Sequence, residues 1–145
     1  MQIIRFEYRS PNEMILRNTG LRKYQASNSA LQHSIVTYGF VNPVIVNEDD
    51  IVVCGENRVI AARALAMEEI PVIVVHTIDE YEIEKYSLVD NQVADMTGWN
   101  LAKKKKVVAE NGIPKGMYGM AYELSTTENV DGFFTEDDTM PLFDL

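Results

Sequence analysis

The chain has 145 residues, of which 46% are hydrophobic, and these values fit one domain of ordinary size with a single core. Its formal net charge is -9, and its one cysteine cannot form an internal disulfide, which favours a reducing compartment. No apolar run approaches the roughly 18 residues that span a bilayer, and no secretory leader is recognisable, so we expect a cytoplasmic protein without a membrane partner.

The first half of the chain predicts a strand, a helix and a hairpin. Residues 3–8 have a strand-like apolar pattern, and a loop rich in Pro, Asn and Gly follows them. Residues 30–38 have helical apolar spacing, with Ser27 or Asn28 as the N-cap and Gly39 as the end. Two β-branched runs then surround a polar turn at 47–50, which is typical of a hairpin.

The second half predicts three more helices and a strand. Residues 56–67 have high helix propensity and many small side chains, as expected for a helix packed against a sheet. Residues 71–75 form an apolar, strand-length run, and helical patterns follow over 79–94 and 100–112. The order of elements predicts an α+β fold with a mixed sheet and packed helices.

Charge is distributed unevenly along the chain. Residues 123–145 contain seven acidic residues and neither Lys nor Arg, whereas the rest carries 13 positive and 15 negative charges, a net of -2. A nearly neutral body neither indicates nor excludes a DNA-binding surface, which needs clustered basic side chains. We therefore expect a folded domain over 1–122 and a flexible acidic tail over 123–145.

Two charged features each allow two interpretations. Lys103 to Lys106 could contact phosphates, or they could simply coat the solvated face of a helix. The acidic tail ends in an apolar tip and could be a disordered spacer or a short anchor for a basic-rimmed pocket on a partner. The apolar residues of the tip are Met140, Pro141, Leu142, Phe143 and Leu145.

The segment "CGENR", residues 54–58, lies where the predicted hairpin becomes a helix. Gly55 allows a tight turn and a close approach to a ligand, and the first N–H groups of a helix have no internal partners. Arg58 could add a planar fork of donors to phosphate oxygens, and Glu56 could orient a metal-bound water or accept a proton. The alternative is structural, because acids stabilise helix starts and glycines mark turns.

Other chemistries have less support in the sequence. Cys54 could be a thiolate nucleophile whose pKa is lowered by the helix start, although a buried cysteine at a strand end is more common. The two histidines, His33 and His76, form no metal-spaced cluster with this cysteine. The segment also lacks the Gly-x-x-x-x-Gly-Lys-Ser/Thr pattern of a P-loop.

The stretch "LQHSIVTYGFVNPVIVNEDDIVVCGENRVIAARALAMEEIPVIVV" resembles the ParB/sulfiredoxin superfamily. The shared features are a helix with a Ser-Ile pair, a Gly-Phe turn, "NPVIV" where Gln-Pro is frequent, and the Gly-x-x-Arg motif as "GENR". The later "LVDNQVADMTGWN" is similar to ParB-like domains associated with phage and plasmid DNA methyltransferases. The resemblance covers roughly residues 3–101 and implies a small ParB/sulfiredoxin-like α+β domain.

The resemblance also implies a ligand site. In ParB proteins the Gly-Glu-x-Arg motif cradles a nucleoside triphosphate with magnesium, so CTP or ATP with Mg²⁺ is the implied cofactor set. Carried over position by position, the nucleotide and phosphate contacts are Gly55, Asn57, Arg58, Asn42, Pro43 and Asn91. The resemblance and the local chemistry together make Glu56 the catalytic candidate, and Asp90 the metal candidate.

Departures from the family limit what is implied. Segregation ParB proteins usually have a second arginine two places after Arg58, where this chain has Ile60. Their helix-turn-helix domain and dimerisation tail have no counterpart here, which argues against centromere binding. In sulfiredoxins the reactive cysteine follows the glycine, whereas Cys54 precedes it, so peroxiredoxin repair is not expected.

The leading hypothesis is a ParB-like nucleotide-binding protein of phage or mobile-element type, in the host cytoplasm, acting in DNA modification, replication or host takeover. Its chemistry would be Mg²⁺-dependent nucleotide hydrolysis or phosphotransfer. Its partners would be the nucleotide and DNA or a DNA-processing protein, such as a methyltransferase, a clamp or a replication protein. One alternative is a non-catalytic adaptor or inhibitor that works through its acidic tail. Another is a ParB-like DNA nuclease.

Overall fold

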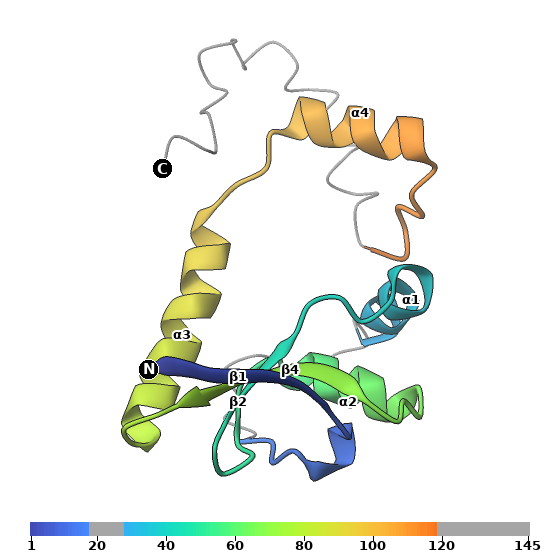
Figure 1. Ribbon diagram of the computed structural model, residues 1–145. Coiled ribbons are helices and arrows are strands. Elements are labelled where there is room, and N and C mark those ends of the chain that lie inside the picture. Colours follow the sequence, from blue (N-terminus) through green and yellow to red (C-terminus); the bar gives the residue numbers. More distant parts are fainter. Residues whose placement is uncertain (18–27, 119–145) are drawn as a thin grey trace. The chain divides into compact units, whose positions relative to one another are not determined.

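The computed structural model describes residues 1–17 and 28–118 (Figure 1). The chain divides into two compact units, Met1–Met96 and Thr97–Leu145, and the second is described as far as residue 118. In chain order the elements are β1 (Gln2–Arg9), the 3-10 helix η1 (Pro11–Glu13), α1 (Asn28–Tyr38), β2 (Val44–Asn47), β3 (Val52–Cys54), α2 (Glu56–Ala64), β4 (Ile70–His76), α3 (Glu80–Met96) and α4 (Leu101–Asn111).

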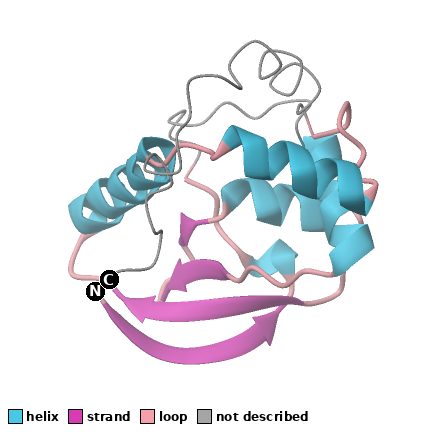
Figure 2. Ribbon diagram, turned by 90° about the horizontal axis from the view of Figure 1, so that it is seen from above, coloured by secondary structure: helices cyan, strands magenta, loops and turns pink. Residues whose placement is uncertain are grey.

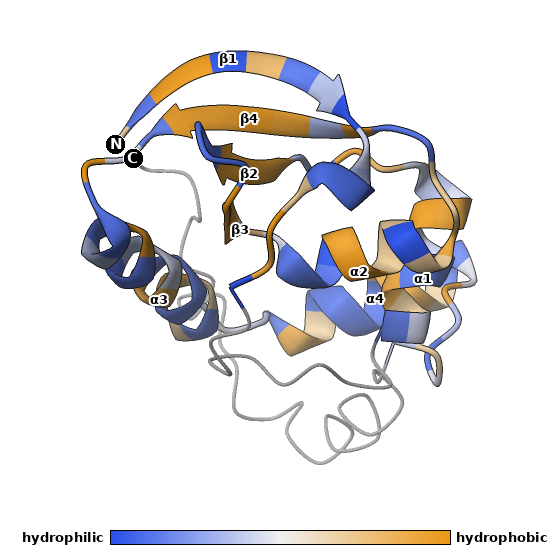
Figure 3. Ribbon diagram, turned by 90° about the horizontal axis from the view of Figure 1, so that it is seen from below, coloured by the Kyte–Doolittle hydropathy of each residue, from blue (hydrophilic) through white to orange (hydrophobic). Residues whose placement is uncertain are grey.

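The first unit is built on a four-stranded mixed sheet in the order β1-β4-β2-β3, seen side by side in Figure 2. The inner strand β4 pairs antiparallel with β1 and parallel with β2, while β2 and β3 form the predicted antiparallel hairpin. Because β4 is covered on both faces, its sequence is a nearly continuous apolar run rather than an alternating one (Figure 3). The predicted α+β fold is confirmed.

The two faces of the sheet pack against different helices. Alternate residues of β2, β3 and β4 point to α2, and the intervening residues point to the start of α3. The first group meets Val59 and Ala62 of α2, and it includes Val44, Val46, Val52, Ile70, Val72 and Val74. The second group meets Ile83 of α3 and includes Val53 and Val75. Helix α1 packs against α2, so the β3–α2 junction lies among the sheet and all three helices of this unit.

Three helix ends lie where the sequence predicted them, whereas Asn28 is the first residue of α1 rather than its N-cap, and the helix predicted over 56–67 ends at Ala64. Gly39 follows α1 with φ +87°, and its N–H donates to the carbonyl of Ile35 at 2.8 Å. Asp79 caps α3 by accepting from the N–H of Glu82 at 2.8 Å, and Gly112 ends α4 with φ +60°. These positions follow from local chemistry, because glycine enters the left-handed region without strain and a carboxylate satisfies an orphan N–H.

The segment that follows η1 is fixed to β3 and α2. Ile15 forms a parallel bridge with Ile51, which lies just before β3. Arg63 of α2 donates to the carbonyls of Pro11 at 3.0 Å and of Met14 at 2.7 Å. These contacts hold the chain as far as Arg17 next to the start of α2, which matters for the site described below.

Some predictions fall outside the described residues. They are the N-cap alternative Ser27 and the acidic tail 123–145 with its apolar tip, together with the boundary after residue 122. Among the described residues, no helix combines the length and the apolar character that a membrane crossing requires.

Candidate functional site

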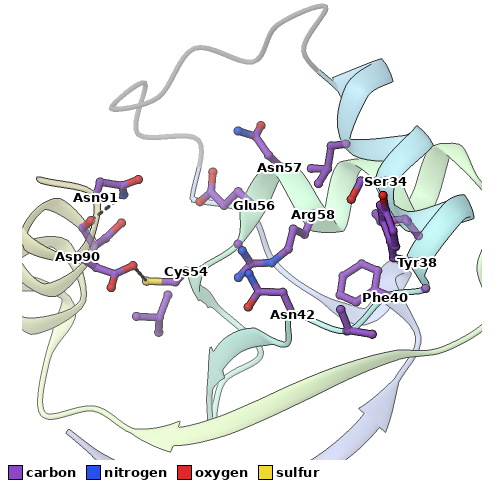
Figure 4. Close-up of a pocket in the computed structure, with 17 residues that line it drawn as sticks. Ser34, Tyr38, Phe40, Asn42, Cys54, Glu56, Asn57, Arg58, Asp90 and Asn91 are labelled. Atoms are coloured by element: carbon purple, nitrogen blue, oxygen red, sulfur yellow. Dashed lines mark hydrogen bonds between the residues drawn. The ribbon is translucent and has the colours of Figure 1, made fainter. Parts of the chain in front are cut away.

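A cavity of about 630 Å³ lies in the first unit, around the β3–α2 junction (Figure 4). This volume is within the range of sites for small ligands. Three parts of the chain line it: α1 with the turn before β2, the end of β3 with the first turn of α2, and the middle of α3. All the predicted site residues except Pro43 contribute to the lining, namely Asn42, Gly55, Glu56, Asn57, Arg58, Asp90 and Asn91.

Gly55 is the N-cap of α2 and adopts φ +105°, ψ 26°, a left-handed conformation that side chains disfavour. It offers no side chain to cap the first N–H groups of α2, which begin at the cavity. A Cβ built on Gly55 would also lie 2.8 Å from Nη2 of Arg58. Two features therefore require a glycine at position 55: the left-handed backbone conformation and the close approach of the Arg58 guanidinium.

Arg58 is folded back against this glycine rather than extended into solvent. Its Nη2 donates to the backbone carbonyl of Pro43 at 3.0 Å, which gives Pro43 a place at the edge of the site. Its Nε is buried and has no hydrogen-bond partner within residues 1–17 and 28–118. Burial lowers the pKa of Arg58, although Cys54 and Asp90 act in the opposite direction. A buried cation with an unsatisfied donor is a group that an anionic ligand would stabilise.

Glu56 lines the cavity, and one of its oxygens is engaged by the backbone. Oε1 accepts the N–H of Arg17 at 2.9 Å, which ties the segment after η1 to the first turn of α2. The side chain thus has a visible positioning contact in addition to the catalytic role predicted from the sequence.

Arg17 is a residue that the sequence reasoning did not assign to the site. The charges of Arg58 and Arg17 both act on the thiol of Cys54, so Arg17 brings a second cation close to the cavity wall. The basic character of the segment before α1 was visible in the sequence. Its proximity to α2 was not, because it depends on the bridge between Ile15 and Ile51.

Cys54 donates its thiol hydrogen to Oδ2 of Asp90, with 3.7 Å between sulfur and oxygen (Figure 4). Burial and the neighbouring Asp90 raise the pKa of Cys54 to about 11, against the opposing charges of Arg58 and Arg17. A thiol with this pKa stays protonated near neutral pH and is a poor nucleophile. The alternative of a pKa lowered by the helix start is therefore wrong.

Asp90 and Asn91 come from α3 and face the cavity from the side opposite α1 (Figure 4). Within the described residues, no group of three or more His, Cys, Asp or Glu could hold a metal ion. The carboxylate of Asp90 and the amide oxygen of Asn91 would suit a Mg²⁺ ion that takes its other ligands from outside the protein. The metal role of Asp90 stays a prediction.

The wall opposite α3 is largely apolar, and it too was missed from the sequence. It consists of side chains from α1 and the following turn, namely Leu31, Ile35, Tyr38, Phe40 and Val41. Leu31, Ile35 and Tyr38 were used in the sequence only to predict a helix, and of the five residues only Ile35 is buried. The cavity thus combines a basic, N–H-rich end with an apolar wall, an arrangement suited to an amphipathic anion.

The sequence matches the family of ParB N-terminal domains over residues 13–92, more than half of the chain. It is 29% identical over 113 residues to the probable chromosome-partitioning protein ParB of Rickettsia bellii, covering 77% of this chain and 38% of the relative. It is 42% identical over 45 residues to the ParB-like nuclease domain-containing protein YnaK of Escherichia coli, covering 31% of this chain and 52% of the relative. The matches therefore span at most about half of each relative's own length.

Solved structures show the same fold. The C-terminally truncated ParB from Caulobacter crescentus, complexed with CTP-gamma-S, superposes with a TM-score of 0.64 at 17% identity over 88% of each chain. The pNOB8-like ParB N-domain has a TM-score of 0.56 at 12% identity, over 90% of this chain and 47% of the other. At such identities the likeness concerns the fold.

Proposed function

The chain belongs to the ParB N-terminal domain family, and we propose that it binds a nucleoside triphosphate in the cavity at the β3–α2 junction. The observation that carries this proposal is the inward guanidinium of Arg58, with its unsatisfied Nε, beside the uncapped start of α2. A helix N-terminus and a guanidinium fork together favour phosphate oxygens.

The two ends of the cavity suggest how such a ligand would lie. The phosphates would occupy the end formed by Gly55, Asn57 and Arg58, with Arg17 as a further source of positive charge. The nucleoside would extend toward the apolar wall, and Asn42 could hydrogen-bond to it at the edge. The Caulobacter neighbour is complexed with CTP-gamma-S, so CTP is the first nucleotide to test, before ATP and GTP.

Magnesium would be held by Asp90 and Asn91 together with the phosphates. When bound, it would neutralise phosphate charge and orient the phosphate chain. Glu56 would organise the first turn of α2 through its bond to the Arg17 N–H, and a role as a general base would use the same carboxylate. The proposal concerns nucleotide binding. Hydrolysis would be a separate step, and substitutions of Glu56 can distinguish it from binding.

Isothermal titration calorimetry with CTP, ATP and GTP, each with and without Mg²⁺, tests this function. We expect saturable binding to the intact protein, and a loss of about tenfold or more in Arg58→Ala, since charge-assisted hydrogen bonds contribute about 1.5–3 kcal/mol. Arg5→Ala is the matched control, because Arg5 is an exposed arginine on β1 that pairs with Glu7 at 2.9 Å and does not line the cavity. Absence of binding by the intact protein would refute the proposal.

A wider role in the DNA metabolism of a phage or mobile element is part of the same proposal, and a DNA-processing protein would be its partner. Genes for a methyltransferase or a replication protein next to the coding sequence would support it. Their absence from the neighbourhoods of several homologues would count against it.

A further inference from the structure

Helix α4 (Leu101–Asn111) concentrates the basic residues of the second unit (Figure 1). Residues 97–118 contain five lysines and a single acidic residue, Glu110, within a chain whose net charge is -9. Four of the lysines are consecutive, from Lys103 to Lys106. Residues 97–118 therefore carry a net positive charge, whereas the whole chain carries a net negative charge.

The position of these lysines does not favour the helix itself. Lys103 and Lys104 lie in the first turn of α4, where the helix dipole disfavours positive charge. Asn100 caps the helix by accepting the N–H of Lys103 at 3.1 Å, and the first turn contains no acid. Lys106 and Glu110 approach at 3.9 Å, but both side chains are well exposed, so this pair contributes little.

An exposed aromatic ring lies beside the lysines. Trp99 is the only tryptophan of the chain, and 69% of its surface is exposed. The ammonium of Lys104 lies 4.4 Å from the centroid of its ring. Basic side chains next to an exposed aromatic ring are the combination with which proteins hold single-stranded nucleic acid, since bases stack on the ring while phosphates meet the charges.

We propose that residues 99–106 form a contact surface for single-stranded DNA. Trp99 stacks a base, while Lys103 and Lys106, three residues apart on one face of α4, neutralise backbone phosphates together with Lys104 beside the ring. None of these residues lines the cavity of the first unit. The proposal therefore does not depend on nucleotide binding, and either can fail alone. Repulsion by the acidic remainder of the chain would keep the affinity modest and strongly dependent on salt.

Fluorescence anisotropy with a labelled oligo-dT, measured over a series of salt concentrations, tests the charge component. Two to three phosphate contacts predict a slope of log Kobs against log salt of about -1.4 to -2.1, since each contact on a single strand contributes about -0.7. Removing two contacts with Lys103→Gln/Lys106→Gln should reduce the slope by about 1.4. Arg5→Gln/Lys85→Gln, which changes the net charge equally through exposed positions elsewhere, should leave it unchanged.

The emission of Trp99 tests the stacking component, because the chain has no other tryptophan. We expect quenching by oligo-dT, and about tenfold weaker binding by Trp99→Leu with its salt slope retained. Circular dichroism checks that each variant is folded. Equal salt slopes in the two double variants would overturn the proposal. So would an emission of the intact protein that oligo-dT does not change, if Trp99→Leu also binds oligo-dT with unchanged affinity.

Discussion

The guanidinium of Arg58 lies directly against the Cα of Gly55, so closely that a Cβ on Gly55 would stand 2.8 Å from Nη2. The glycine and the arginine of the Gly-x-x-Arg motif thus form one structural unit. The glycine provides the backbone turn and the space, and the arginine fills that space with a cation facing the cavity.

Replacing this glycine should destabilise the fold more than replacing a comparable glycine. Gly39→Ala is the reference, because Gly39 also has a positive φ, +87°, but a Cβ there would meet no close atom. The nearest atom, Cγ1 of Val41, would lie 3.8 Å away. Left-handed strain alone predicts a loss of about 1–2 kcal/mol in the free energy of unfolding for Gly39→Ala. Gly55→Ala should lose about 1 kcal/mol more, because the guanidinium must move from its buried position. Urea denaturation measures both, and equal losses would show that the close contact has no energetic weight.

The thiol of Cys54 should react slowly with alkylating reagents at pH 8. Burial raises its pKa from 9.0 to about 11, so the thiolate fraction of the folded protein is about 100-fold smaller than that of an unperturbed thiol. The rate, followed by mass spectrometry, should rise with pH until about 11. Asp90→Asn should shift this rise to lower pH, because Asp90 is the second cause of the raised pKa. A midpoint near 9 in the folded protein would contradict the buried, Asp90-bonded thiol.

Asn47 should be among the most sensitive polar positions of the first unit. It is buried, and its Oδ1 accepts the N–H groups of Asp49 and Ile51, both at 3.0 Å, while its Nδ2 donates to Thr77. Asn47→Ala leaves these groups without partners, and each buried loss costs about 1–3 kcal/mol. We expect the free energy of unfolding to fall by about 2–4 kcal/mol in chemical denaturation. Asn111→Ala, which removes only an exposed bond to a helix carbonyl, should change it little.

Two substitutions of Glu56 separate positioning from catalysis. Glu56→Gln retains an oxygen that can accept the Arg17 N–H, whereas Glu56→Ala does not. If Glu56 positions the segment before α1, Glu56→Gln should bind nucleotide like the intact protein, and Glu56→Ala should bind several-fold more weakly. If Glu56 is also a general base, any nucleotide hydrolysis should be lost in both variants. Equal affinities of all three proteins would exclude the positioning role.

The alternative of a nuclease is tested by plasmid nicking with Mg²⁺. Our proposal of a nucleotide site predicts no nicking above that of a buffer control. Nicking that requires Mg²⁺ and disappears in Glu56→Ala would instead favour the nuclease. Nicking that persists in the variant would indicate a contaminating enzyme.

Local patterns in the sequence identified most of the elements and the main feature of the site. The β-branched runs before residue 54, the helix-forming run after it and the glycine between them predicted a strand-to-helix junction with an anion-binding character. The junction is present, because period and propensity act over a few residues and are visible in a single chain. Local chemistry left a structural role open for Gly55 and Arg58, and the resemblance to the ParB/sulfiredoxin superfamily then assigned both residues to a phosphate site.

Tertiary structure decided which distant residues join this junction. Asp90 reaches Cys54 only because Ile83 anchors α3 on the face of the sheet formed by Val53 and Val75. Arg17 approaches the same site because Ile15 bridges Ile51, a contact between residues far apart in the chain.

The sequence by itself thus determined the elements, their order and the glycine-arginine pair, since these depend on neighbouring residues. Only the folded chain decided that the arginine turns inward, that the cysteine stays protonated and that α3 faces the junction. Each of these depends on burial and on long-range packing, which the spacing of apolar residues along the sequence does not reveal.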